Sequence, residues 1–371
     1  MLPYILLFLI SVLFSFATVK KQNNQYVVVM GKNDNIKRNN CAIIAFFVLL
    51  LLIMALRDES VGRDLVGYRI SFKDIISRKN TDIIKEDEDT LYVFLNWIVG
   101  KFTTNFQWFI AISSALTLIP IFYVYNQNKN YSVLKILLFL NMTTFPMVFS
   151  GIRQSIAMGI GMIAYLFVKS KNIIPFVISV VIAIGFHHSA FILFFMYPLY
   201  HFAFKRKHLL VIIPAVLTIF VFNKQVFAFL TDIMGTFSEE YSNVEMTETG
   251  AIGSLILFII FAVFCYIIPD EKSMSKELFG LRNFMVFVVI LQCFAPLHTL
   301  AMRLNYYYIL FVPILVPQIM TLSRVSYRQV SLWGGRIMSV FFTYLYLSTV
   351  VTSYYSGIST LDIIPYTFFW Q

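Results

Sequence analysis

Long apolar runs alternate with short polar segments along most of this chain. Twelve runs approach the length at which a helix crosses a bilayer, which is about 20 mostly apolar residues with a tolerance of a few. They lie at 2–19, 41–56, 106–125, 132–150, 152–168, 173–187, 189–204, 208–222, 250–268, 281–299, 304–321 and 333–355. The pattern predicts an all-α fold, a polytopic bundle of about 12 transmembrane helices that forms a single integral membrane domain over residues 1–371.

Two polar segments between these runs are longer than simple connections. Residues 57–105 include a short apolar stretch at 91–103, which has too few residues to span a bilayer. We expect this stretch to form a short amphipathic or re-entrant helix within an extracytoplasmic loop. Residues 223–249 are rich in acidic side chains and predict a second extracytoplasmic loop.

Composition supports a membrane protein and argues against nucleic-acid binding. The chain has 59% hydrophobic and 13% charged residues, whereas about a quarter of the residues in a soluble domain are charged. Its net charge of +10 comes from short basic clusters between apolar runs, and no basic stripe with interleaved aromatic residues is present. The three cysteines lie at unrelated spacings, which favours neither a disulfide framework nor a thiolate metal site.

The distribution of charge predicts the orientation of the chain. Cytoplasmic loops are enriched in Lys and Arg. If the N-terminus lies outside, the basic clusters within 20–38, 205–207 and 272–282 all lie inside, and most acidic residues lie outside. The first 18 residues are apolar and no basic segment precedes them. This predicts a first membrane span there, not a cleavable signal peptide.

Charged residues crowd the start of the first extracytoplasmic loop, in the segment RDESVGRDLVGYRISF at 57–72. Arginine forks match phosphate oxygens, and a carboxylate can hold sugar hydroxyls or accept a proton. Gly62 and Gly67 permit close approach of the backbone. The segment predicts a phosphate and sugar site, and a solvated surface loop is the alternative interpretation. The candidate residues are Arg57, Asp58, Arg63, Asp64, Tyr68 and Arg69.

A second motif, SGIRQSIAMGIG at 150–161, places Arg153 and Gln154 at the outer end of a predicted span. An ionisable residue at that depth is costly and indicates function. The alternative is an arginine that extends its guanidinium to the headgroup boundary. Small residues in the motif, including Gly159, predict close helix packing.

Histidine and arginine recur at the same predicted outer level. His187 and His188 begin the sequence HHSA at a tight outer turn, and histidine is the side chain best suited to move protons near neutral pH. Packing is the alternative role. Arg303 precedes a tyrosine cluster that begins at Tyr306, and His298 lies just before it.

The acidic sequence EDED at 86–89 could hold a divalent cation. Acidic residues are also expected there because a helix is predicted to begin near Thr90, where the helix dipole favours negative charge. We favour the second interpretation and expect no metal. The arginines, histidines and Asp64 instead predict one shared outer cavity that suits an anionic substrate carried on a lipid.

The motifs RDESVGRDLVGY at 57–68, GIRQSIA at 151–157 and H-x-S-A at 187–190, Arg303 before its tyrosines, and PYTFFW at 365–370 resemble those of the EpsG family. Its members are Wzy-like polymerases of bacterial capsular polysaccharide and exopolysaccharide. The resemblance covers nearly the whole chain. It implies a fold like that of the C-type glycosyltransferases, a multi-pass protein of the bacterial inner membrane, and reaction without a nucleotide sugar, cofactor or metal.

The resemblance also implies substrates and partners. The donor is an oligosaccharide repeat unit on undecaprenyl diphosphate, and a second lipid-linked unit is the acceptor. Membrane lipids, a flippase and chain-length regulator proteins are the expected partners. By this resemblance Arg153 and Arg303 hold the diphosphate, with Arg57 as the third candidate. The remaining polar candidates, expected to bind the glycan, are Asp58, Arg63, Tyr68, Gln154, His188 and Tyr306.

We expect an acceptor hydroxyl to attack the anomeric carbon while arginines stabilise the departing diphosphate. His187, which H-x-S-A selects over His188, or Asp64 accepts the proton. Two alternatives stay open. A lipid-linked oligosaccharide flippase should carry charge at several depths and show internal repeats, and a membrane acyltransferase or ligase that modifies glycan should use residues at the cytoplasmic face.

Overall fold

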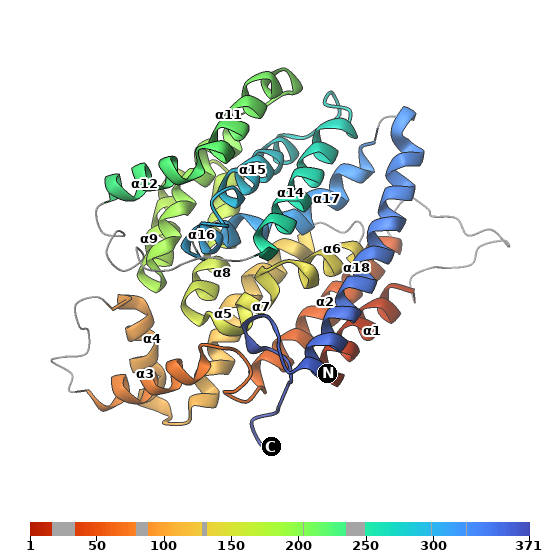
Figure 1. Ribbon diagram of the computed structural model, residues 1–371. Coiled ribbons are helices and arrows are strands. Elements are labelled where there is room, and N and C mark those ends of the chain that lie inside the picture. The colour runs from red at the N-terminus through yellow and green to blue at the C-terminus, as the bar shows by residue number, and fades with distance from the viewer. Residues whose placement is uncertain are drawn as a thin grey trace. The chain divides into compact units, whose positions relative to one another are not determined.

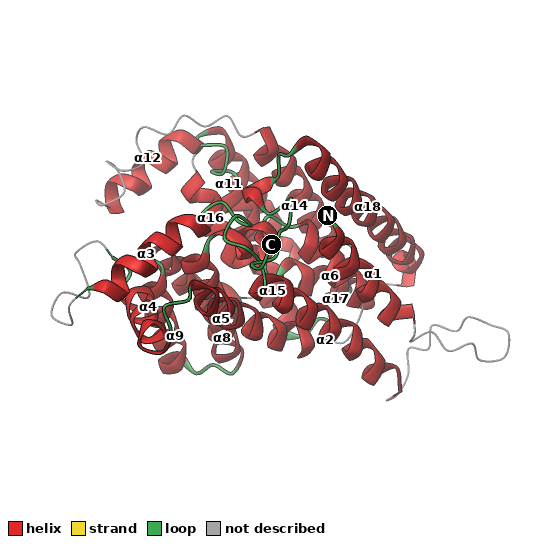
Figure 2. Ribbon diagram, turned by 90° about the horizontal axis from the view of Figure 1, so that it is seen from below, coloured by secondary structure: helices red, strands yellow, loops and turns green. Residues whose placement is uncertain are grey.

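The computed structural model describes residues 1–16, 34–78, 88–127, 132–202, 204–234, 249–297, 299–323 and 325–371. Within these ranges every regular secondary-structure element is a helix, as Figure 2 shows. The β-pairing in these ranges is limited to two isolated bridges, Arg57 with Phe368 and Pro269 with Ser323. The prediction of an all-α fold is therefore confirmed.

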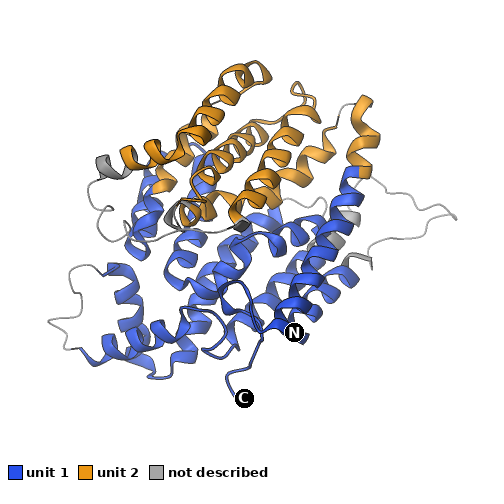
Figure 3. Ribbon diagram, in the orientation of Figure 1, with its two compact units in different colours: residues 1–191, 334–371 blue, residues 192–333 orange. Residues whose placement is uncertain are grey.

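The chain divides into two compact units, coloured separately in Figure 3. Unit 1 contains residues 1–191 and 334–371, and unit 2 contains residues 192–333. The single membrane domain that the apolar runs predict stays a prediction.

Unit 1 contains the N-terminal helices and most of the long last helix (Figure 1). Their bounds are α1 Leu2–Phe16, α2 Asp34–Ala55, α3 Leu65–Ser77, α4 Thr90–Phe102, α5 Phe106–Gln127, α6 Ser132–Asn141, α7 Thr144–Ser150, α8 Ile152–Lys169, α9 Ile173–Phe186 and α18 Arg328–Ser356. Helix α8 packs against α5 and α9. A Cβ at Gly159 would lie 2.8 Å from the Leu116 carbonyl oxygen of α5, so the predicted close packing at this glycine is confirmed.

Unit 2 is built around α15. Its helices are α10 Met196–His201, α11 Leu209–Val221, α12 Asn223–Met234, α14 Thr249–Ile267, α15 Lys276–Gln292, α16 Thr299–Ile309 and α17 Val312–Thr321. Helices α10, α14, α16 and α17 all contact α15. The buried Asn305 amide of α16 donates to the Val288 carbonyl and to Gln292 Oε1 of α15, at 3.0 and 2.9 Å.

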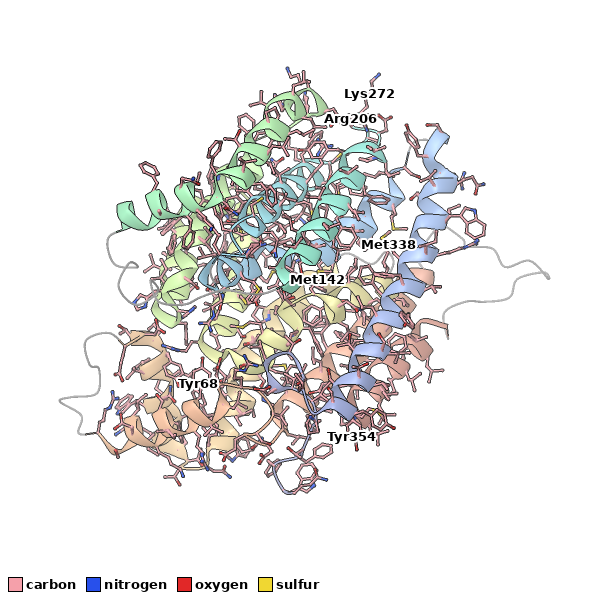
Figure 4. The ribbon with its side chains drawn as sticks, in the orientation of Figure 1. Tyr68, Met142, Arg206, Lys272, Met338 and Tyr354 are labelled. Atoms are coloured by element: carbon pink, nitrogen blue, oxygen red, sulfur yellow. The ribbon has the colours of Figure 1, made fainter. Side chains whose placement is uncertain are left out.

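A buried arginine closes the end of unit 2 where the basic cluster predicted to be cytoplasmic lies. Arg282 is 0% exposed, and its Nη2 donates to the Phe204 carbonyl at 2.6 Å and to Glu271 Oε1 at 2.7 Å. Arg206 donates to the Tyr266 and Pro269 carbonyls from the same side, near Lys272 (Figure 4). Pairing explains why this charge is tolerated, because a buried guanidinium needs both a counter-charge and hydrogen bonds.

Every predicted apolar run contains helix in the described residues. By length and composition α5 and α18 can cross a membrane, and three bent pairs can do so if each counts as one span. Two of these pairs are α6 with α7, bent by 63°, and α16 with α17, bent by 42°. The number of about 12 transmembrane helices stays a prediction.

The segment 57–105 contains two helices, where the sequence predicted one. The expected helix at 91–103 is α4, displaced by one residue. Helix α3 was not predicted, because its sequence LVGYRISFKDIIS mixes charged residues and glycine with apolar ones. Phe72 and Ile75 of α3 pack with Tyr92, Val93 and Phe109 in one apolar cluster.

Candidate functional site

A buried aspartate, Asp89, lies at the centre of the charged residues in unit 1. Its side chain is 2% exposed. Arg153 Nη1 donates to Asp89 Oδ2 at 2.8 Å, and His188 Nδ1 lies 3.0 Å from Asp89 Oδ1. His187 Nδ1 lies 3.7 Å from Oδ2. Three residues predicted from two separate motifs therefore lie around one carboxylate.

Helix ends bring these side chains together. Asp89 immediately precedes α4, Arg153 lies in the first turn of α8, and His187 follows the last residue of α9. Helix α9 contacts both α4 and α8. The two histidines differ in accessibility, since the side chain of His187 is 19% exposed and that of His188 is 67% exposed.

Asp89 occupies the N-cap position of α4, yet its side chain makes no capping hydrogen bond. An aspartate that only capped the helix would accept a backbone N–H from the first turn. The carboxylate contacts Arg153 instead. The position of Asp89 at the N-terminus of α4 agrees with the helix-dipole interpretation of EDED. The contact with Arg153 is an additional interaction, and the sequence did not single out Asp89 as a site residue. Glu86 and Asp87 lie outside the described residues.

Two tyrosines form an aromatic wall beside Arg153. The centre of its guanidinium lies 6.0 Å from the Tyr68 ring and 5.7 Å from the Tyr92 ring. These distances permit cation–π attraction. Burial raises the pKa of both phenols above its ordinary value, so each stays protonated near neutral pH. Tyr68, labelled in Figure 4, comes from α3, so this helix contributes to the site.

The residue before Asp89 is held by a two-point ion pair. Arg78 Nη1 and Nη2 donate to the two carboxylate oxygens of Glu88 at 2.6 and 2.7 Å. The hydrogen bonds to Glu88 raise the pKa of Arg78. Because Arg78 follows α3 and Glu88 lies just ahead of α4, this pair fixes the ends of the two helices next to the Asp89 backbone.

Residues 57–64, the first part of the segment RDESVGRDLVGYRISF and called the 57–64 motif below, pack against Phe149 and against Ser150 at the start of the 150–161 motif. Gly62 has φ +119°, and a Cβ there would lie 2.8 Å from the Phe149 carbonyl oxygen. The Asp64 N–H donates to Ser150 Oγ at 3.2 Å. Close approach at Gly62 is therefore confirmed, whereas Gly67 is an ordinary position of α3, where an added Cβ would meet no atom within 4 Å. Asp64 is half-buried at the start of α3, and its role as a base stays a prediction.

The C-terminal tail, residues 359–371, covers the start of the 57–64 motif. The Asp58 N–H donates to the Thr367 carbonyl at 3.0 Å, and the Arg63 N–H donates to the Leu361 carbonyl at 2.9 Å. Arg63 Nε also pairs with Asp362 at 3.0 Å, both side chains being more than half exposed. Asp58 Oδ1 accepts the Ser60 N–H. The glycan roles predicted for Asp58 and Arg63 stay predictions.

Arg57 lies beneath this tail. Its side chain is 1% exposed and its guanidinium lies 5.2 Å from the Phe149 ring. Among the described residues neither Nε nor Nη1 has a hydrogen-bond partner. Burial lowers the pKa of Arg57 to about 10, so it stays charged at neutral pH. Its role as a third diphosphate ligand stays a prediction, and contact with phosphate requires movement of the covering residues.

The remaining predicted residues lie elsewhere. Gln154 is 2% exposed in the first turn of α8. Arg303 and Tyr306 belong to α16 of unit 2, where Arg303 is exposed and Tyr306 is 3% exposed. His298 lies outside the described residues. Their roles stay predictions.

Within the part of the chain that the structure describes, no group of three His, Cys, Asp or Glu side chains could hold a metal ion.

Comparison with known proteins gives one family. The sequence pattern of the EpsG family matches residues 40–368. This range includes all the motifs of the site and all but the last two residues of PYTFFW. No curated protein matches the chain, and no solved structure does.

Proposed function

Because this chain belongs to the EpsG family, we propose that it is a Wzy-like exopolysaccharide polymerase. In this proposal it joins undecaprenyl-diphosphate-linked repeat units into capsular polysaccharide or exopolysaccharide. The reaction takes place at the extracytoplasmic face of the bacterial inner membrane.

The observation that carries this proposal is the cluster of Arg153, His187 and His188 around Asp89. A guanidinium suits a diphosphate because its planar fork donates two parallel hydrogen bonds. The Arg153 side chain is 40% exposed, so part of the fork is available to a ligand. An imidazole beside it can accept a proton near neutral pH. The cluster thus combines a ligand for a phosphorylated leaving group with a base.

The reaction follows from these two capacities. An acceptor hydroxyl attacks the anomeric carbon of the donor glycan as the bond to the diphosphate breaks. Arg153, with Arg303 as its expected partner, stabilises the negative charge that develops on the leaving group. His187 accepts the hydroxyl proton, with Asp64 as the alternative, and general-base catalysis of this kind contributes about 10² to 10⁴ in rate.

The aromatic wall suits the sugar part of the substrate. The ring of Tyr68 is next to Arg153, and it offers both an apolar face and a phenolic O–H for a glycan. The charge pattern of the chain supports an extracytoplasmic site. When the Lys- and Arg-rich segments are placed in the cytoplasm, the sequence motifs that contain Asp89, Arg153 and the two histidines are placed on the outer side.

Arg153→Lys and Arg303→Lys in a strain that makes the cognate polymer test the proposal. Lysine keeps the charge but loses the fork. We expect shorter or no polymer on a gel, with single repeat units accumulating on lipid in the outer leaflet. Normal polymer from both variants would refute the site, and repeat units trapped in the inner leaflet would indicate a flippase.

A further inference from the structure

One carboxylate is shared between a permanent cation and two titratable rings. Asp89 Oδ2 accepts a hydrogen bond from Arg153, and Oδ1 faces His188 Nδ1 at ion-pair distance without the alignment of a hydrogen bond. A buried carboxylate needs a compensating charge. In this arrangement Arg153 supplies that charge, and the imidazoles lie ready to supply it when Arg153 is engaged elsewhere.

We propose that Asp89 is a positioning residue that couples diphosphate binding at Arg153 to proton acceptance by the adjacent histidines. This inference rests on the proposed function and deepens it. Nothing in the motifs that resemble the EpsG family assigns such a role to Asp89.

The coupling follows from competition for the guanidinium. A diphosphate that binds Arg153 draws its positive charge away from Asp89, because charge-assisted hydrogen bonds to phosphate are strong. The buried carboxylate is then left to the imidazoles. A new bond forms between the acceptor oxygen and the anomeric carbon, and the bond from that carbon to the diphosphate breaks with its electron pair leaving on the phosphate. The hydroxyl proton moves to an imidazole, and Asp89 stays ionised and stabilises the imidazolium.

Neighbouring residues fix the position of Asp89 and leave its carboxylate free of helix capping. The ion pair of Arg78 with Glu88 fixes the preceding residue, and the side chain is not used as a helix cap. Tyr68 and Tyr92 limit the positions open to Arg153. Arg153 can therefore turn from the carboxylate to a ligand without leaving the cluster.

Two opposite changes in Asp89→Asn test the inference. Asparagine keeps the shape but removes the competitor for Arg153. Inorganic diphosphate should bind the purified full-length protein more tightly, by on the order of tenfold, by titration calorimetry. Turnover of lipid-linked repeat units should fall by about 10²-fold, because the base loses its partner. Asp89→Glu, which keeps the charge, should recover part of the turnover.

Asp362→Asn is the matched control. Asp362 also pairs with one arginine, Arg63 at 3.0 Å, but its side chain is 53% exposed, and such pairs contribute little. Diphosphate affinity and turnover should both match those of the unmodified protein. A change in either that equals the change in Asp89→Asn would overturn the specific role of the buried carboxylate.

A double-mutant cycle separates competition for the guanidinium from a general effect of removing the Asp89 charge. Asp89→Asn is combined with Arg153→Gln, which removes the guanidinium for which Asp89 and the diphosphate compete. Compared with Arg153→Gln alone, the double variant should bind diphosphate equally and turn over more slowly. A gain in affinity in this background overturns the proposal, and so does a loss of affinity in Asp89→Asn itself. The diphosphate titration applies whether or not polymer forms, so its failure is distinct from a failure of the wild-type protein to polymerise.

Discussion

At the scale of single residues, Arg57 shows that a motif can name a residue without revealing its surroundings. The sequence places Arg57 beside other charges, which predicts a ligand-binding side chain. In the structure it is buried against Phe149 under the C-terminal tail. The sequence alone does not show that the C-terminal tail covers residues 57–64, which are about 300 positions away.

Arg57→Met separates a structural from a functional arginine. A buried guanidinium with unpartnered nitrogen atoms costs free energy, and an apolar side chain of similar length avoids this cost. We expect the thermal midpoint of the purified protein to be unchanged or higher, with a gain of up to about 4 kcal/mol in unfolding free energy. Loss of polymer with an unchanged midpoint would assign Arg57 to the reaction, and a large fall in the midpoint would contradict the cost expected from its burial.

The contact made by Gly62 could be predicted from the sequence, whereas the role of Asp89 could not. Gly62 could be predicted, because glycine in a charged turn is typical of close backbone approach. Asp89 could not, because acidic residues before a helix are expected from the dipole alone. Only the missing capping bond and the contact with Arg153 separate these roles, and both depend on where α8 packs.

Gly62→Ala should destabilise the protein by about 1 to 3 kcal/mol. Its φ of +119° and the Phe149 carbonyl 2.8 Å from an added Cβ leave no room for a methyl group. Gly67→Ala is the matched control. This position has open space and lies within α3, so alanine should stabilise it slightly. Equal thermal midpoints for the two variants would contradict the packing of the 57–64 motif on Phe149.

At the scale of elements, the apolar runs predicted helices well, while breaks and additional helices were not predicted. Length and hydropathy located α5 and α18. They could not predict the 63° bend between α6 and α7, because apolar composition continues across it. Helix α3 was missed because only one side of it is buried, through Leu65, Phe72 and Ile75.

The C-terminal tail acts as a structural element although it contains little helix. Tyr366 Oη donates to the Ile53 carbonyl at 2.8 Å, and Tyr4 Oη donates to the Ile363 carbonyl at 2.6 Å. Together with the backbone bonds to 56–63, these contacts join the tail to both α1 and α2. The sequence PYTFFW was recognised as a motif, but its partner in the fold was not.

Removal of residues 359–371 should lower the thermal midpoint and abolish polymer formation. The deletion exposes the buried Arg57 and leaves the Asp58 and Arg63 backbone without partners. Asp362→Asn is the control, because it removes only the charge of the exposed ion pair with Arg63, and such pairs contribute at most about 1 kcal/mol. Differential scanning fluorimetry and a polymer gel compare the two. A truncated protein with full activity would contradict the conclusion that the tail stabilises α1, α2 and the 57–64 motif.

At the scale of the whole molecule, charge predicts the orientation in the membrane. A cysteine at Asn105 should react with a membrane-impermeant maleimide in intact cells, and a cysteine at Lys207 should react only after lysis. Both positions are exposed, and the native cysteines are replaced beforehand. The opposite labelling pattern would invert the topology and move the Asp89 cluster to the cytoplasmic side.

Polymerisation from a lipid-diphosphate donor is the proposed activity on which the roles of Arg153, His187 and Asp89 depend. The most direct measurement reconstitutes the purified protein in liposomes with undecaprenyl-diphosphate-linked repeat units and no nucleotide sugar. We predict polymer of many repeat units, with one undecaprenyl diphosphate released for each bond formed, and loss of both products in Arg153→Lys. Repeat units that stay monomeric beside active, correctly folded protein, or that merely change leaflet, would contradict the proposed polymerase.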